Sequence, residues 1–112
     1  MADNNVKELD DSTFAEDVAS GVSVVDFWAP WCGPCRMQGP IVEDVAAKVG
    51  SSATVAKVNV DDSPQTAARF QIRSIPTIVV LKDGELVKQF SGVQSAETLL
   101  DALSEIGVSQ EQ

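Results

Sequence analysis

The segment from Val22 to Trp28 constrains the fold more than any other part of the chain. It reads Val-Ser-Val-Val-Asp-Phe-Trp, a nearly continuous run of β-branched and aromatic residues. A strand with one face in water alternates apolar and polar residues, whereas a continuous run is typical of a strand covered on both faces. We therefore expect a central strand here.

Strand and helix patterns alternate around this segment. We predict further strands at residues 6–9, 54–60, 77–81 and 86–91, and helices at 13–20, 32–50, 63–70 and 95–107. The buried stripes of the two longer helices are predicted at Met37, Ile41, Val45 and Val49, and at Leu99, Leu100, Leu103 and Ile106.

Short polar signals mark where these elements begin and turn. Thr13 with Glu16 predicts a capping box for the first helix, and Ser63 and Ser95 are predicted N-caps of later helices. Asp83-Gly84 between two strand patterns favours an antiparallel hairpin.

The predicted fold class is α/β, with a single mixed five-stranded sheet flanked by four helices and ending in the hairpin and a C-terminal helix. A chain of 112 residues has room for one domain, so we expect residues 1–112 to form a single unit. Residues 1–5 and 108–112 are expected to be flexible tails.

Charge and hydropathy exclude several classes of partner. Seventeen acidic and eight basic residues give a net charge of −9, which disfavours binding to nucleic acid or to an anionic membrane surface. No apolar run approaches the roughly 20 residues that span a bilayer, and the first residues resemble no export signal. We therefore expect a cytoplasmic protein.

Two cysteines and no histidine restrict the chemistry to sulfur. Cys32 and Cys35 lie two residues apart, but a zinc site needs four ligands and c-type haem needs a histidine after the second cysteine, where Arg36 stands. We expect no metal and no cofactor. A disulfide that only staples the turn would stabilise little, because the loop that it closes is short.

A redox role explains where the pair lies, at the junction between a strand and a helix. A thiolate near a helix N-terminus is favoured by unpaired N–H groups and by the helix dipole. We expect Cys32 to face solvent and attack, and Cys35, one turn on, to resolve. Gly33 and Pro34 shape the spacer, since Pro34 suits a first turn and Gly33 permits close approach of a partner.

Two charged residues interrupt apolar strands. Asp26 lies in the central strand, where burial should raise its pKa. Lys57 lies among Val55, Ala56, Val58 and Val60; either Asp26 is its partner, or its stem is buried and its amine reaches water.

Residues 28–37, Trp-Ala-Pro-Trp-Cys-Gly-Pro-Cys-Arg-Met, resemble the active-site signature of the thioredoxin family. The resemblance runs from residue 6 to about residue 107. It implies that Asp26 and Lys57 assist proton transfer, that Trp28 packs beneath the site, and that the bond before Pro76 is cis, although sequence alone favours trans. It also implies a client-docking surface formed by Trp31, Ile75, Gly92 and Val93 around Cys32.

The expected function is that of a protein-disulfide reductase, a thiol-disulfide oxidoreductase that exchanges its dithiol for a client disulfide. The resemblance implies disulfide-containing clients, a thioredoxin reductase as electron donor and a monomeric state. Three alternatives remain open: a disulfide oxidant or isomerase of the same fold, a redox-independent binding subunit, and a dimer that shares a metal cluster.

Overall fold

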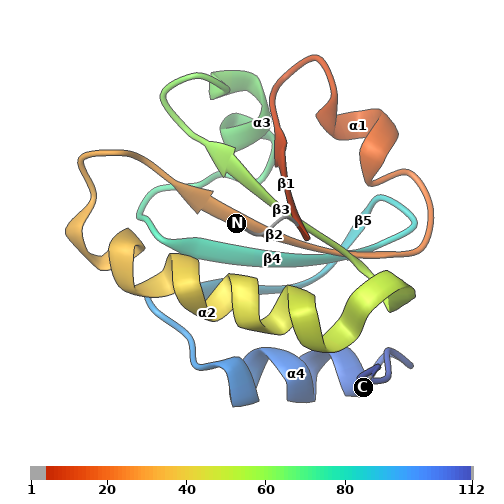
Figure 1. Cartoon of the computed structure of the whole chain (residues 1–112). Coiled ribbons are helices and arrows are strands. Elements are labelled where there is room, and N and C mark those ends of the chain that lie inside the picture. The colour runs from red at the N-terminus through yellow and green to blue at the C-terminus, as the bar shows by residue number, and fades with distance from the viewer. Residues whose placement is uncertain (1–4, 112) are drawn as a thin grey trace.

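Five strands form one mixed sheet in the order β1-β3-β2-β4-β5 (Figure 1). The computed structural model describes residues 5–111, and its strands are β1 (Val6–Leu9), β2 (Val22–Trp28), β3 (Thr54–Asn59), β4 (Thr77–Lys82) and β5 (Glu85–Ser91). β1 and β2 flank β3 in parallel, β4 is antiparallel to β2, and β4 and β5 form an antiparallel hairpin. Asp83 and Gly84 both have positive φ, as the tight hairpin turn requires. The predicted sheet is confirmed.

Helices cover both faces of this sheet. They are α1 (Phe14–Asp17), α2 (Gly33–Val49), α3 (Pro64–Arg69) and α4 (Ala96–Ser104), with a 3₁₀ turn at Gly50–Ser52. Figure 1 shows α2 and α4 on one face and α1 and α3 on the other. No helix within residues 5–111 is long and apolar enough to cross a bilayer.

The central strand β2 is buried on both faces, as its composition predicts. Val24 packs into the core shared with α2 and α4, whereas Val25 and Phe27 pack with Phe14 and Phe70 on the opposite face. Successive side chains of a strand point to opposite faces. Asp26 therefore lies on the same face as Val24, beneath α2.

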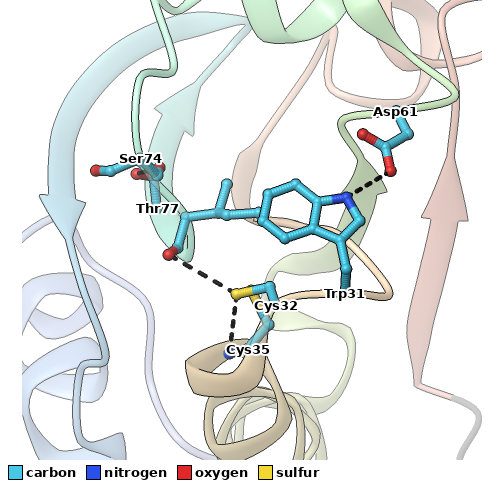
Figure 2. The surroundings of a disulfide bond; sticks show 7 residues. Trp31, Cys32, Cys35, Asp61, Ser74 and Thr77 are labelled. Carbon is cyan, nitrogen blue, oxygen red and sulfur yellow. Dashed lines mark hydrogen bonds between the residues drawn. A yellow bond between two sulfur atoms is a disulfide. The ribbon is translucent and has the colours of Figure 1, made fainter.

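The chain enters α2 at Cys32, and Cys35 lies in the first turn of that helix (Figure 2). Cys32 holds the N-cap position, Pro34 lies in the first turn, and the helix continues through Pro40. The predicted stripe is wrong at Met37, which is 64% exposed. Steps of four residues drift around a helix of 3.6 residues per turn, so the buried face instead includes Cys35 and Gln38.

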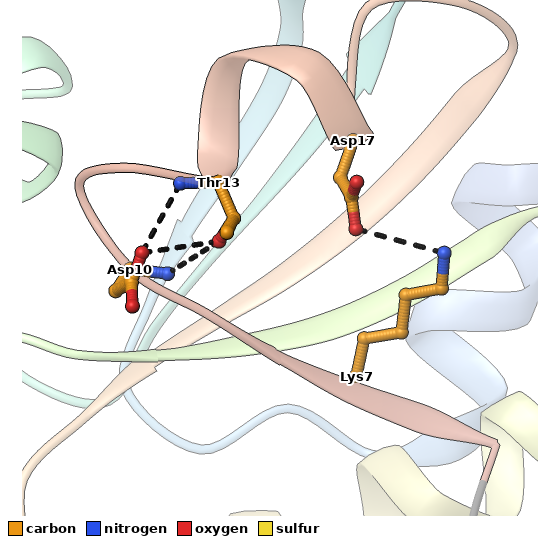
Figure 3. A network of polar contacts seen from close by, with 4 residues as sticks. All are labelled: Lys7, Asp10, Thr13 and Asp17. Carbon is orange, nitrogen blue, oxygen red and sulfur yellow. Dashed lines mark hydrogen bonds and ion pairs between the residues drawn. The ribbon is translucent and has the colours of Figure 1, made fainter.

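The predicted capping box of the first helix is wrong. α1 spans only Phe14–Asp17, and the side chain of Thr13 makes no capping bond. The hydroxyl of Thr13 instead accepts from the N–H of Asp10, and the Asp10 carboxylate accepts from the N–H of Thr13 (Figure 3). Lys7 of β1 lies 3.6 Å from the carboxylate of Asp17, and Figure 3 also draws this ion pair. Asp10 therefore takes up one donor that the capping box would have used, the N–H of Thr13.

The N-cap predicted at Ser63 is also wrong in its chemistry. Ser63 is in position, but its side chain is fully buried and makes no capping bond to α3. Asp11, in the segment between β1 and α1, accepts from the N–H of Thr66 at 2.8 Å and of Gln65 at 3.2 Å. α3 is thus capped by a distant segment of the chain. The N-cap at Ser95 of α4 is confirmed, because its side chain accepts from the N–H of Thr98.

The expectation of a flexible tail after residue 107 is wrong for the residues described. Val108 is buried against the core beneath α2 and α4. The N–H of Glu111 donates to the carbonyl of Lys48 at 2.6 Å, and its carboxylate accepts from Ser51 and Ser52. This segment is docked on the end of α2. Gln112 and residues 1–4, most of the other predicted tail, lie outside the described residues.

Candidate active site

Cys32 and Cys35 form a disulfide across the first turn of α2, with their Cα atoms 5.3 Å apart. The Sγ atom of Cys32 accepts from the N–H of Cys35 at 3.2 Å, as Figure 2 shows, and lies 3.8 Å from the carbonyl oxygen of Ile75. The two residues are 4% and 6% exposed. The expected outward orientation of Cys32 is therefore wrong for this oxidised state, because the closed ring turns its sulfur towards the helix and Ile75.

The first turn of α2 distinguishes the two sulfur atoms even so. Cys32 is the N-cap of the helix. Its sulfur therefore accepts from the N–H of Cys35, which has no carbonyl partner within the helix, and lies at the positive end of the helix dipole. No acidic residue lies in this turn to oppose a negative charge. In the dithiol state these features favour a thiolate at Cys32, whereas Cys35 lies inside the helix.

Asp26 is a buried acid close to the cysteines. It is 3% exposed, and its Oδ1 has no hydrogen-bond partner within the described chain. Burial raises its pKa to about 7, and the positive charge of Lys57 partly opposes that rise. A cavity of about 370 Å³ is lined by Asp26, Lys57 and both cysteines. A cavity of this size has room for water next to the Asp26 carboxyl and the sulfur atoms.

Lys57 lies beside Asp26 in the sheet but is paired elsewhere. The two residues are register partners on β3 and β2, yet Nζ of Lys57 pairs with Glu8 of β1 at 3.4 Å and lies 5.1 Å from the centre of the Trp28 ring. Within residues 5–111 the carboxylate that pairs with Lys57 is Glu8. The expectation of a direct Asp26–Lys57 ion pair is therefore wrong, and the alternative, an amine that reaches water, describes Lys57 better.

The residues expected to dock a client lie around Cys32. Trp31 is 67% exposed, Val93 is exposed, and Ile75 is partly buried. The Ile75-Pro76 bond is cis, and the carbonyl of Pro76 accepts from the N–H of Gly92, which joins the two loops. The structure thus brings these segments together from three parts of the sequence.

Two side chains that support this surface were not predicted. The indole N–H of Trp31 donates to Asp61 at 2.8 Å, which holds the exposed ring beside the cysteines (Figure 2). Gln38, fully buried, donates to the carbonyl of Gln94 at 3.1 Å and accepts from its N–H at 2.7 Å, so it anchors the loop that contains Val93. Gln38 follows Cys35 by three residues, so the helical period was a usable signal for it. Asp61 gave no comparable signal.

Comparison with known proteins agrees with this geometry. The thioredoxin family model matches residues 5–105. A thioredoxin of Staphylococcus haemolyticus is 46% identical over 98 residues, which cover 88% of this chain and 94% of that protein. Thioredoxins of Staphylococcus saprophyticus and Staphylococcus aureus are each 44% identical over the same lengths. A redox-active cysteine pair that caps a helix, with this fold and these relatives, places the chain in the thioredoxin family.

Proposed function

We propose that this protein is a protein-disulfide reductase, which reduces disulfide bonds in client proteins by dithiol-disulfide exchange. One observation carries the proposal: Cys32 and Cys35 form a disulfide in which the Cys32 sulfur caps α2 and accepts a backbone hydrogen bond. A pair placed in this way supports a reactive thiolate in its reduced form. The family membership of the chain supports the same reaction.

In the first step, the Cys32 thiolate attacks one sulfur of the client disulfide. A new bond forms between Cys32 and that sulfur, the client disulfide breaks, and the other client sulfur leaves as a thiolate that takes up a proton. The N–H of Cys35, 3.2 Å from Sγ of Cys32, and the helix dipole stabilise the attacking anion before the step.

In the second step, Cys35 attacks the sulfur of Cys32 in the mixed disulfide. The Cys32–Cys35 bond forms, the mixed disulfide breaks, and the client leaves with two thiols, so two electrons pass from this protein to the client. Cys35 must lose its proton to attack. We assign Asp26 as the acceptor, because it is buried, lines the same cavity, and has a pKa of about 7, which suits proton exchange near neutrality.

The client binds as an extended segment across the surface around Cys32. Trp31 and Val93 offer exposed apolar contact area, and we assign the backbone at Ile75 to pair with the client as an added strand. Gly33 and Pro34 are exposed in the spacer between the cysteines, so they let the client backbone approach closely. Trp28 lies beneath this surface and lines the cavity that holds Asp26.

A separate enzyme returns the protein to its dithiol state, and we assign this role to a thioredoxin reductase that carries its own flavin and nicotinamide. We further propose that the protein acts as a cytoplasmic monomer of one domain, with no cofactor of its own. The net negative charge of the chain disfavours binding to nucleic acid and to anionic membrane surfaces, which supports this proposal.

Reduction of insulin disulfides by dithiothreitol tests the proposal directly. The unmodified protein should accelerate the reaction, and Cys32→Ser should abolish the acceleration. Cys35→Ser should instead accumulate a mixed disulfide with insulin, because the resolving sulfur is missing. Full activity of Cys32→Ser, or trapping by Cys32→Ser rather than by Cys35→Ser, would contradict the assigned roles.

Equilibration with a glutathione buffer tests the direction of electron flow. A reductase should remain mostly oxidised in a buffer that leaves a disulfide oxidant mostly reduced. A protein that is mostly reduced in the same buffer would behave as a disulfide oxidant. That result would contradict the assignment as a reductase but not the thiol-disulfide exchange itself.

A further inference from the structure

Three charged residues lie side by side across adjacent strands next to the cysteines. Glu8 of β1 is the register partner of Lys57 of β3, and Lys57 is the register partner of Asp26 of β2. Register partners on neighbouring parallel strands point to the same face of a sheet and lie roughly 5 Å apart. The row therefore runs from the edge of the sheet to its buried centre.

Solvent exposure falls steeply along this row. The side chain of Glu8 is 70% exposed and that of Lys57 is 36% exposed, whereas Asp26 is 3% exposed. The ammonium of Lys57 thus lies between an acid in water and an acid in the core. It can lean towards either one, because the lysine stem is flexible.

In this structure the ammonium of Lys57 leans outward. It lies 3.4 Å from Oε2 of Glu8 and 5.1 Å from the centre of the Trp28 ring, while Oδ1 of Asp26 has no hydrogen-bond partner among the described residues. Glu8 and Asp26 therefore compete for one positive charge, and Glu8 holds it.

We propose that Glu8 is a positioning residue for the exchange reaction: by holding the ammonium of Lys57 against its own carboxylate, it withholds that charge from Asp26 and so keeps Asp26 able to take up a proton. The inference rests on the proposed role of Asp26 in deprotonating Cys35. An ammonium that moved fully against Asp26 would favour the carboxylate, and a weaker base would then face Cys35.

Other charged and titratable groups face this row and remain when Glu8 is changed. Around the cavity next to Asp26 these are Lys57, Cys32, Cys35 and Arg36. Across a second cavity of about 750 Å³, Lys57 faces Asp10, Asp11 and Asp62. These three acids will still attract the ammonium outward, so we expect removal of Glu8 to weaken the effect and not to eliminate it.

Titration of the Asp26 carboxyl by carbon NMR, on the oxidised protein, tests the proposal. Glu8→Gln keeps the shape of the side chain and removes its charge. We expect the proton affinity of Asp26 to fall by roughly two- to fivefold, the range that one exposed ion pair can transmit. Glu85→Gln is the matched control, because it removes the same charge from the exposed hairpin at the far end of the sheet. An unchanged titration in Glu8→Gln, or an equal change in Glu85→Gln, would overturn the proposal.

A second comparison asks whether Glu8 acts through Lys57. In a Lys57→Gln background, the change from Glu8 to Gln should shift the Asp26 titration much less than in the native background. An equal shift in both backgrounds would show that Glu8 acts by its own field, which also overturns the positioning role. Thermal unfolding of each variant confirms that it is folded.

The pH profile of insulin reduction gives the functional result. At acid pH the rate should fall as Asp26 becomes protonated. The pH at which the rate falls should be lower in Glu8→Gln than in the unmodified protein, and it should be unchanged in Glu85→Gln. The NMR titration does not depend on catalytic turnover. The proposed function and the role of Glu8 can therefore be contradicted independently. Loss of insulin reduction by the unmodified protein would contradict the proposed function, whereas normal turnover with an unshifted Asp26 would contradict only the role of Glu8.

Discussion

Replacing the Asp26 carboxyl by an amide, in Asp26→Asn, should stabilise the protein at alkaline pH and not at acid pH. Burial raises the pKa of Asp26 from 3.8 to about 7 in the folded protein. The folded state therefore holds this proton more tightly than the unfolded state does. As pH rises from about 4 to about 7, the unfolded chain releases the proton first, so the free energy of unfolding of the unmodified protein declines through this interval.

The size of this decline follows from the change in pKa. At about 1.4 kcal/mol for each pH unit, it amounts to about 4 kcal/mol above pH 7. The amide of the variant has no proton to lose in this range. The free energy of unfolding of the variant, minus that of the unmodified protein, should therefore be about 4 kcal/mol larger at about pH 8.5 than at about pH 3.5. Burying an amide also has a cost, but this cost is the same at every pH. It therefore cancels when the difference at about pH 8.5 is compared with the difference at about pH 3.5.

Guanidinium chloride unfolding of the oxidised protein, followed by tryptophan fluorescence at each pH, measures the difference. Asp101→Asn, in an exposed position of α4, controls for the removal of one negative charge. A difference between Asp26→Asn and the unmodified protein that stays flat with pH would refute the reasoning. It would mean that Asp26 is hydrated or paired in a way that its burial does not suggest.

Three further predictions concern side chains that hold the site and its frame in place. Gln38→Ala should lower the free energy of unfolding by about 1–3 kcal/mol in chemical denaturation, because it leaves the partly buried N–H and carbonyl of Gln94 without their partner, and it should raise the KM for insulin. Asp61→Ala should raise the KM roughly two- to fivefold with little change in kcat, because it frees the indole of Trp31; an unchanged KM would mean that the hydrogen bond does not matter for docking. Asp11→Ala should lower the denaturation midpoint while Ser63→Ala should not, and the reverse order would restore Ser63 as the cap of α3.

The sequence predicted the order of strands and helices well, because each of these elements carries a strong local pattern. The continuous apolar run at 22–28 and the Asp83-Gly84 turn are short-range signals, and both are found as expected. Helix caps were predicted less well. Asp11 caps α3 from a distant segment, so its role depends on how the chain folds. Asp10 acts locally on Thr13, where the Thr13–Glu16 pattern pointed to a different set of hydrogen bonds.

In the candidate site, too, the features set by local sequence were predicted and those set by the folded sheet were not. The position of the cysteines at the start of a helix and the burial of Asp26 followed from the residues around them. The partner of Lys57 did not, because Asp26 and Glu8 are both its neighbours in the sheet, and only the folded structure shows which of them holds the ammonium.

The docked segment at Val108–Glu111 has a practical consequence for attaching this protein to a surface. Glu111 is bound at the end of α2 that is remote from the cysteines, and a helix of 17 residues places the two ends about 25 Å apart. A tether joined after this segment should leave the end of α2 that carries the cysteines free to meet clients in solution. The immobilised protein would then act as a reusable reducing matrix, whereas attachment through lysine amines would also engage Lys57 beside the reactive pair.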